Sequence, residues 1–457
     1  MAGMSDVAVA LGISVPVLRF LVFFFSTIPI GWLWRLMPNP TARHLYSAIT
    51  GMLVSHLAFG PGANALFVFP LVVTYASMVI HRPSCGIVSF VLDFAFLISC
   101  HVYYMSGDAW KEGGIDSTGA LMVLTLKLVS CAMCYQDGLL EEEKLRRTQK
   151  RNRLVRRPSV LEYLGYCFCC GTHLAGPVYE MKDYIDWSEE QGLWKFSEGN
   201  APSPYRDTLR VLLKALFCMG MYMLLIPRVR FTRILEPEFM QWKFWARWFY
   251  MWLCGFSARW KYYFIWSISE ASLIISGLGF SGWSSSQPPR PRWDQALNVD
   301  IPGVELAGSA AEVPSKWNIH ISTWLRHYVY ERLVPPGKKA GFQQLLATQV
   351  VSAVWHGLYA GYIMFFVHTA VLISGSRALY RWQKAIPDHL SFLRPLAWFL
   401  NFAYTLLVLN YACIGFLVLD ARDTFTAYKS VYFAGTLLPI ALTAIGTVIK
   451  PRKTRVQ

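Results

Sequence analysis

Long apolar stretches recur along the whole chain, and this feature constrains the fold more than any other. A helix needs about 20 mostly apolar residues to cross the hydrocarbon core of a bilayer. Stretches of this kind lie near residues 7–37, 44–60, 64–81, 84–105, 118–136, 207–226, 244–268, 343–373, 394–419 and 428–449. Two further runs, near 159–176 and 268–283, are short or rich in glycine, which favours re-entrant or broken helices. The sequence therefore predicts an all-α polytopic membrane protein with about ten to twelve transmembrane helices, plus re-entrant or interfacial helices.

The balance of charge agrees with a membrane environment. Charged residues make up only 16% of the chain, whereas a typical soluble domain has about 25%. The net charge of +15 fits basic loops that face the cytosol and contact anionic lipid headgroups. We therefore expect membrane lipids as partners, and no nucleic acid. No internal repeat is visible, which argues against a transporter built from inverted repeats.

Polar stretches form loops without marking a domain boundary, so we expect a single domain over residues 1–457. The stretch 141–158 carries eight Lys and Arg residues, which predicts a cytosolic loop near anionic headgroups. The stretch 284–315 is rich in Pro, Ser and Gly and is expected to be a polar surface loop. The tail at 450–457 has four basic residues and is expected in the cytosol.

The ten cysteines lie mostly in or near apolar stretches, which is typical of buried small residues rather than of a disulfide framework. Cys131 and Cys134 form a CxxC pair, and a second group lies at 167–173, in the sequence CFCCGTH. Neither group has a second pair at the spacing of a zinc site. We therefore predict no metal site.

One histidine, His356, lies in a stretch from Ala340 to Ser376 that holds no Asp, Glu, Lys or Arg. An ionisable side chain at membrane depth is costly unless it is paired, and it usually marks a working site. Such an imidazole can act as a general base on an alcohol, or it can simply hydrogen-bond a neighbouring helix. His368 lies about 120° away on a regular helix, so the two histidines are not expected to share a metal ion.

The segment 316–333 is aromatic and basic, and it is too polar to span a bilayer. The residues that would share one helical face are Trp317, Ile321, Trp324 and Tyr328. This pattern predicts a helix at or just inside the membrane interface. Asn318 lies on the adjacent stripe, where its side chain could make a packing hydrogen bond or act in catalysis.

A single carboxylate stands out in another apolar segment. Glu270 is the only charged residue between Lys261 and Arg290. We expect its side chain to be paired or to face a polar cavity.

Several motifs together resemble one family. The sequence WHGLYAGY at 355–362 lies downstream of WNIHISTWL at 317–325. With KYYFIWSISEASLIISGLGFSGW at 261–283, SGDAWKEGGIDSTGALM at 106–122 and GPVYEMKDY at 176–184, the chain resembles the membrane-bound O-acyltransferase family. Within that family it is similar to the plant-type lysophospholipid acyltransferases. The resemblance covers nearly the whole chain and is weakest in the loops and at both ends.

The resemblance implies a fold and an activity. The fold would be a helical bundle that encloses a catalytic chamber in the endoplasmic reticulum membrane. The enzyme would transfer a fatty acyl group from acyl-CoA to the free, mostly sn-2, hydroxyl of a lysophospholipid, chiefly lysophosphatidylcholine with broader headgroup use. Acyl-CoA would be a cosubstrate that enters from the cytosol, the lysolipid would enter from the bilayer, and no cofactor would be needed. The oligomeric state stays open.

The family's catalytic histidine corresponds to His356 and its paired asparagine to Asn318. His356 would be the general base, and Asn318 would orient the imidazole or stabilise the oxyanion. The candidates for substrate contact are Trp355, Tyr359, Trp324, Lys261, Tyr262, Trp266 and Glu270. One alternative is an O-acyltransferase that acts on a sterol, diacylglycerol or protein. Another is a proton-coupled transporter that uses His356 and Glu270 as a relay.

Overall fold

The computed structural model describes residues 2–60, 62–105, 117–197, 201–335, 337–338 and 340–449. Within these residues α-helices dominate, irregular segments connect them, and the strands are one short antiparallel pair, β1 (Gly282–Trp283) and β2 (Pro291–Arg292). The predicted all-α class is confirmed. The basic tail at 450–457 and most of the motif at 106–122 lie outside the described residues.

The chain forms two compact units. Unit 1 comprises Met1–Leu216 and Phe264–Asn298, and unit 2 comprises Phe217–Tyr263 and Val299–Gln457. The boundary between the units falls within two long helices, α11 (Tyr205–Leu225) and α12 (Phe244–Ser276), each of which contributes to both.

Unit 1 packs around helix α6. The helices that belong wholly to this unit are α1 (Ala2–Leu11), α2 (Val15–Trp34), α3 (Pro40–Phe59), α4 (Ala63–Ile80), α5 (Cys85–Met105), α6 (Thr118–Asp137), α7 (Arg147–Asn152), α8 (Val160–Cys167), α9 (Cys170–His173) and α10 (Met181–Ser188). Helix α3 packs against α2 and α8, and α6 packs against α4 and α5. The run expected at 159–176 is the broken pair α8 and α9, whose residues are mostly buried.

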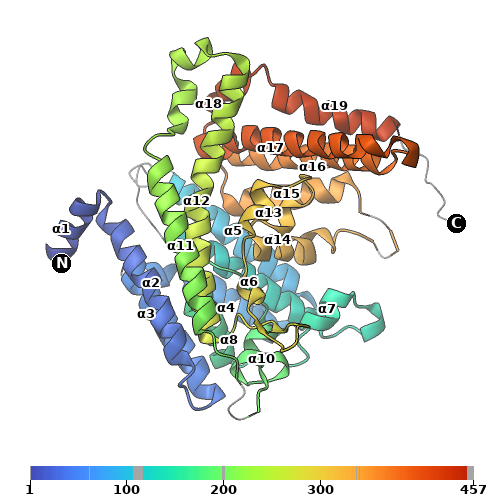
Figure 1. Cartoon of the computed structure of the whole chain (residues 1–457). Helices are drawn as coiled ribbons and strands as arrows, with labels where there is room; N and C mark the ends of the chain where they lie inside the picture. The colour runs from blue at the N-terminus through green and yellow to red at the C-terminus, as the bar shows by residue number, and fades with distance from the viewer. Residues whose placement is uncertain are drawn as a thin grey trace. The chain divides into compact units, whose positions relative to one another are not determined.

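Unit 2 packs around helix α16. Its own helices are α13 (Ile301–Glu305), α14 (Ile319–Leu325), α15 (Phe342–His356), α16 (Ala360–Lys384), α17 (Arg394–Val418), α18 (Ala421–Ser430) and α19 (Ala434–Val448). Helix α16 packs against α15, α17 and α19, which lie beside it in Figure 1. The core includes Ala370, Val408 and Tyr411, which have no exposed surface.

Seven helices in the described part of the chain are long and apolar enough to cross a membrane, or eight if the bent pair α18 and α19 is one span. These seven are Val15–Trp34, Ala63–Ile80, Arg82–Tyr103, Thr118–Asp137, Tyr205–Leu225, Ala360–Lys384 and Asp388–Val418. The sequence predicted ten to twelve transmembrane helices, which is more than the described residues support. Three of the helices in the predicted runs do not qualify: basic and histidine side chains lower the hydropathy of α3, Trp and Tyr side chains lower that of α12, and α15 has only 15 residues.

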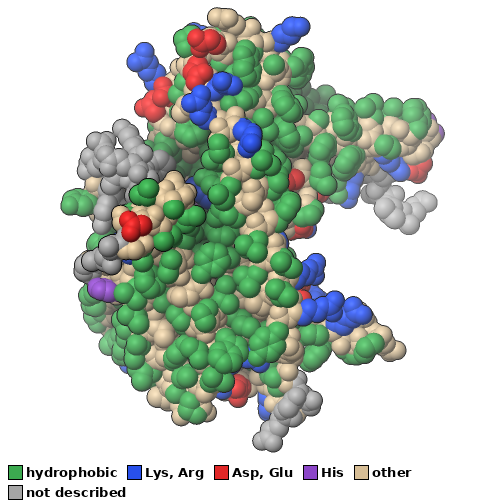
Figure 2. Space-filling view, turned by 60° about the vertical axis from the view of Figure 1, so that its left-hand side comes forward, with side chains coloured by type: hydrophobic (Ala, Val, Ile, Leu, Met, Phe, Trp, Pro, Cys, Tyr) green, Lys and Arg blue, Asp and Glu red, His purple; other side chains and the backbone are tan. Residues whose placement is uncertain are grey.

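The surface carries the apolar side chains expected of a protein in lipid. On α11, Leu209, Leu213, Leu216 and Phe217 are 58–62% exposed and recur at helical spacing. Figure 2 shows hydrophobic side chains over much of the face in view. Continuous apolar surface of this kind is rare on soluble monomers and marks an interaction surface, here the bilayer. The predicted polytopic membrane protein is therefore confirmed.

The stretch 284–315 is only partly the surface loop that its composition predicted. Residues 285–290 are exposed, but Ala296, Val299 and Ala310 are at most 2% exposed. Proline and serine supply ten of its 32 residues and indicate a loop, but small apolar residues between them pack inside the protein. The stretch is therefore an exposed loop over residues 285–290, and beyond Trp293 it alternates between buried and exposed residues.

Candidate active site

The apolar run expected at 343–373 is two helices. Helix α15 ends at His356, and Gly357 follows with a φ of 131°, a backbone conformation that favours glycine. A Cβ on Gly361 would lie 2.1 Å from the carbonyl oxygen of Gly415, so the start of α16 is pressed closely against α17. His356 therefore lies at a break between two helices, not in the middle of a span.

Aromatic rings surround the half-buried imidazole of His356. Its ring centroid lies 4.5 Å from that of Trp355, 4.7 Å from Phe366, 5.7 Å from Phe416 and 6.0 Å from Tyr362. These rings come from α15, α16 and α17, so three helices fix the orientation of the imidazole.

One hydrogen bond determines which nitrogen of His356 can act as a base. Nδ1 lies 2.7 Å from the carbonyl oxygen of Ser352, one turn earlier in α15. A carbonyl oxygen only accepts hydrogen bonds, so Nδ1 carries the proton and Nε2 of the neutral ring carries the lone pair. The same carbonyl, together with the negative end of the α15 dipole, favours positive charge on the ring. The arrangement suits a side chain that takes up a proton at Nε2.

Asn318 lies at the start of α14, in an unusual backbone conformation. Its φ of 45° and ψ of 55° are left-handed, and its side chain makes no capping hydrogen bond to the first turn. Asparagine tolerates this conformation better than other residues with a Cβ. The preceding residue, Trp317, packs its ring 5.7 Å from the rings of Tyr262 and Tyr263. The expectation that Asn318 lies inside a continuous helix is therefore wrong.

The rest of the 316–333 segment agrees with its pattern. Ile321, Trp324 and Tyr328 are 2–6% exposed, which confirms a buried face for these three residues, whereas Trp317, predicted on the same face, precedes α14 and is half-buried. The segment continues past α14 as a π-helix, Arg326–Tyr330, that packs against both α14 and α15. Through this π-helix the structure connects the helix that follows Asn318 to the helix that ends at His356.

The candidates for substrate contact have different surroundings. Trp355 and Trp324 are buried and Tyr359 is half-buried, with its ring 5.7 Å from that of Tyr362. Lys261 is exposed, and its ammonium lies 5.1 Å from the ring centroid of Tyr262. These residues belong to unit 2 together with His356 and Asn318. Their contact with substrate stays a prediction.

The two remaining candidates, Trp266 and Glu270, are buried residues of unit 1. Glu270 accepts a hydrogen bond of 2.6 Å from the ammonium of Lys214 on α11, which confirms the expectation that this carboxylate is paired. A paired carboxylate is poorly suited to relay protons, so this ion pair argues against the transporter alternative. Sequence reasoning missed Lys214, because nothing in the sequence links positions 56 residues apart.

Comparison with known proteins identifies the family. The model of the membrane-bound O-acyltransferase family matches residues 102–418, a segment that includes Asn318 and His356. The chain belongs to the membrane-bound O-acyltransferase family. It is 58% identical over 453 residues to lysophospholipid acyltransferase 1 of Arabidopsis thaliana, covering 99% of this chain and 98% of that protein. It is 57% identical to lysophospholipid acyltransferase 2 of the same plant, and 30% identical to the lysophospholipid acyltransferase of Schizosaccharomyces pombe. These last two comparisons cover 99% and 93% of this chain, and 97% and 84% of the respective relatives.

A buried cation lies beside the cysteine group of this O-acyltransferase family member. Lys127 in α6 has no exposed surface, and its ammonium donates to the carbonyl oxygens of Tyr166 and Cys167 and to the hydroxyl of Thr172. These carbonyls lie at the C-terminal end of α8, where a positive charge is favourable. The His173 ring packs against Phe67 and Phe168 instead. The group around 167–173 therefore surrounds a lysine.

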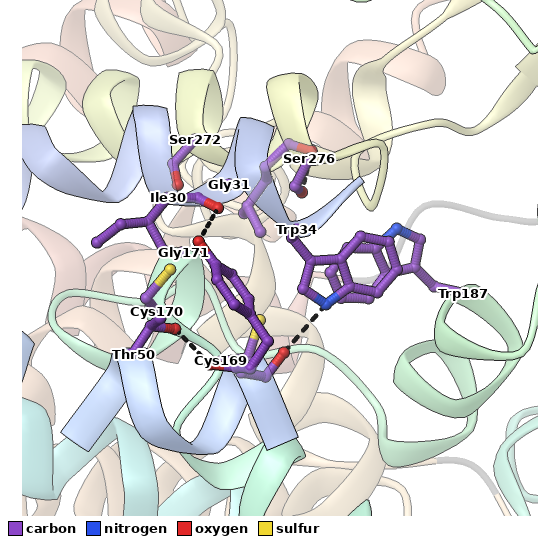
Figure 3. A pocket seen from close by; sticks show the side chains of 13 residues that line it. Ile30, Gly31, Trp34, Thr50, Cys169, Cys170, Gly171, Trp187, Ser272 and Ser276 are labelled. Carbon is purple, nitrogen blue, oxygen red and sulfur yellow. Dashed lines mark hydrogen bonds between the residues drawn. The ribbon is translucent and has the colours of Figure 1, made fainter. Parts of the chain in front are cut away.

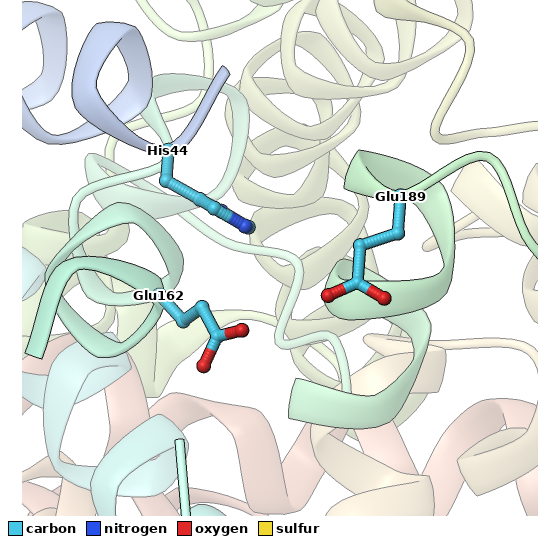
Figure 4. Close-up of side chains that lie close together, drawn as sticks. All are labelled: His44, Glu162 and Glu189. Carbon is cyan, nitrogen blue, oxygen red and sulfur yellow. The ribbon is translucent and has the colours of Figure 1, made fainter. Parts of the chain in front are cut away.

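A second group was not anticipated from the sequence. The side chains of His44, Glu162 and Glu189 converge so that possible ligand atoms lie within 4.8 Å of one another (Figure 4). However, Arg156 donates two hydrogen bonds of 2.7 and 2.8 Å to Glu162 and one of 3.3 Å to Glu189. Burial raises the pKa of Glu162, but hydrogen bonds from Arg156 and Ser159 outweigh it and lower the pKa to about 2. One guanidinium therefore already binds both carboxylates of this group, which holds the 141–158 stretch against α8 and the segment after α10.

A small pocket in unit 1 lies between α2, α3 and neighbouring segments (Figure 3). The rings of Trp34 and Trp187 stack in its wall, 3.5 Å apart. The thiol-bearing residues Cys169 and Cys170 also line it. None of the predicted site residues does, so the pocket carries no part of the proposed chemistry.

Proposed function

We propose that the protein transfers a fatty acyl group from acyl-CoA to the free, mostly sn-2, hydroxyl of a lysophospholipid. The observation that carries this proposal is the His356 imidazole, which donates from Nδ1 to Ser352 and keeps Nε2 as the basic nitrogen. The names of these relatives support a lysophospholipid as the acceptor. Lysophosphatidylcholine is the acceptor proposed first, with broader use of headgroups.

The reaction is a direct transfer between two substrates. Nε2 of His356 takes the proton of the acceptor hydroxyl while that oxygen attacks the thioester carbonyl. The carbonyl oxygen becomes an oxyanion, and the amide of Asn318 donates to it or orients the imidazole. The carbon–sulfur bond then breaks, the thiolate of CoA leaves, and the proton on the imidazolium passes to that sulfur. The products are a diacyl phospholipid and free CoA, and no covalent enzyme intermediate forms.

The reactivity of the thioester and the apolar surroundings of His356 support catalysis by a single base. A thioester is already activated, so general-base catalysis of about 10²–10⁴ adds to the effect of holding both substrates in place. The four aromatic neighbours of His356, among them Phe366 and Phe416, provide an apolar wall on which an acyl chain could pack. We propose acyl-CoA as cosubstrate, with no cofactor and no metal in the reaction, and the endoplasmic reticulum membrane as the site of action.

The test is a panel of donors and acceptors with purified protein, read by mass spectrometry of the lipid products. Acceptors should include lysophospholipids of several headgroups, diacylglycerol and a sterol, with acyl-CoA of several chain lengths as donor. We expect a lysophospholipid to be acylated and CoA to be released in equal amount. Turnover of a sterol or diacylglycerol in preference to every lysophospholipid would refute the proposed acceptor class.

The matched variants are His356→Ala and His368→Ala. His368 is the other histidine of this region, and its Nε2 lies 2.9 Å from the carbonyl oxygen of Gly435. Loss of His356 should lower turnover by about 10²-fold or more, as expected for a general base. Loss of His368 should leave turnover of the folded protein unchanged. Near wild-type turnover in His356→Ala would remove this residue from the mechanism.

A further inference from the structure

A buried network of charged and polar groups lies within unit 2, on the side of α12 that precedes Phe264. Arg259 donates two hydrogen bonds of 2.7 Å to the carboxylate of Glu305, and a third of 2.6 Å to the side-chain oxygen of Asn410. The hydroxyl of Tyr263 donates to the same carboxylate at 2.6 Å. The side chains of Arg259 and Glu305 are 11% and 15% exposed. Paired, charge-assisted hydrogen bonds of this kind hold their partners in a defined geometry.

This network reaches the residue next to Asn318. The ring of Tyr263, whose hydroxyl is held by Glu305, packs edge-on against the ring of Trp317 at 5.7 Å between centroids. Tyr263 has no exposed surface, so its ring has little freedom to move. Trp317 directly precedes Asn318, where the backbone is left-handed.

The start of α13 also contacts the segment that precedes Asn318, through Lys316. Asp300, which caps α13 through Gly303, accepts a hydrogen bond of 2.9 Å from the ammonium of Lys316. The backbone N–H of Asp300 also donates to the carbonyl oxygen of Lys316, at 2.9 Å. Helix α13 is therefore tied to Lys316 at its start and, through Glu305 and Tyr263, to Trp317 at its end.

We propose that Tyr263 and Glu305 are positioning residues that hold Asn318 in its left-handed conformation. Glu305, fixed by Arg259, holds the Tyr263 hydroxyl; the Tyr263 ring holds Trp317; and Trp317 orients Asn318 toward the reacting groups. This inference rests on the proposed function, in which the Asn318 amide acts on the reaction. A left-handed non-glycine residue is strained, and such strain persists only where the surroundings enforce it.

Tyr263→Phe tests the inference with little disturbance, because it removes one hydroxyl and leaves the Arg259–Glu305 pair intact. Tyr404→Phe is the matched control, since Tyr404 is also buried in unit 2 and its hydroxyl donates to the carbonyl oxygen of Leu372. Loss of alignment at a reacting group is expected to lower kcat of Tyr263→Phe about tenfold or more, with KM for acyl-CoA changed less than twofold. Tyr404→Phe should lose thermal stability to a similar extent and keep its kcat.

Combining Tyr263→Phe with Asn318→Gly separates this inference from the proposed function. If Tyr263 acts through Asn318, the double variant should turn over no more slowly than Asn318→Gly alone. Losses that multiply would show an independent effect and overturn the inference, as would wild-type kcat in Tyr263→Phe. Wild-type kcat in Asn318→Gly would instead refute the role of Asn318 in the proposed function. Trp317→Phe changes the other ring of the Tyr263–Trp317 contact, and kcat of this variant should also fall.

Discussion

Replacing Asn318 by three different residues separates the contribution of its backbone from that of its side chain. Asn318→Gly removes the amide and keeps easy access to the left-handed conformation with φ 45° and ψ 55°. Asn318→Ala removes the same amide but adds the cost of a left-handed residue with a Cβ, about 1–2 kcal/mol. Because the Asn318 side chain makes no capping hydrogen bond, neither variant loses a cap of α14.

The expected magnitudes differ between activity and stability. Loss of one oxyanion-type donor lowers turnover by about 10²–10³, so Gly and Ala should be nearly equal in turnover. Ala should be less stable than Gly, by about the cost of the left-handed residue. Asn318→Asp replaces the donor with a negative charge, so it should be the slowest of the three if the amide stabilises an oxyanion. Affinity for acyl-CoA should stay close to that of the wild type in all of them.

The assay measures turnover, acyl-CoA affinity and thermal unfolding on the same purified preparations. Normal turnover in Asn318→Gly would show that the side chain has no role in the reaction. Equal stability of the Gly and Ala variants would refute the argument from backbone conformation. If all variants lost expression and stability while the remaining folded protein turned over normally, Asn318 would have only a packing role.

Three other changes have outcomes set by the structure. Gly357→Ala places a Cβ at a φ of 131°, so we expect lower thermal stability and, because His356 precedes it, lower kcat; an unchanged kcat would contradict the role given to this break. The pKa of Glu162 is about 2 in the folded protein and 4.5 in the reference state, so this carboxyl stabilises the fold above about pH 4.5 and loses that effect as the pH falls toward 2. The stability gap between wild type and Glu162→Gln should therefore narrow in melting curves taken below pH 4.5, and a constant gap would refute the assignment. A glycosylation acceptor inserted in 141–158 should stay unmodified in intact endoplasmic reticulum, since its basic residues predict a cytosolic loop; efficient modification would invert the proposed orientation.

The sequence predicted those parts of the fold that depend on local pattern. The buried face of Ile321, Trp324 and Tyr328 follows from helical spacing alone, and the structure has it. The break after His356 was missed because apolar residues continue through it. A signal was present, however, since glycine is common directly after the end of a helix.

Other features of the candidate site depend on long-range contacts that a single sequence does not contain. Lys214 pairs with Glu270 across 56 positions, and Arg259 meets Asn410 across 151. No periodicity connects such residues, because their meeting depends on how helices pack. The left-handed turn at Asn318 was only partly predictable from the sequence. Asparagine is among the residue types that adopt this conformation, but the apolar pattern of its neighbours predicted a helix that begins before Asn318.

Lys127 has a consequence for the way this chain enters the membrane during synthesis. The oxygens that bind its ammonium belong to residues 39–45 positions later in the chain, so they are synthesised only after Lys127 itself. At ordinary rates of translation the delay is about 2–9 s. A lone lysine at the centre of a membrane helix costs about 2.5–3.5 kcal/mol to insert. Helix α6 is therefore expected to wait beside protein or water until α8 and α9 have been made, and a nascent chain that stops before residue 160 has no oxygen from those helices to bind this ammonium.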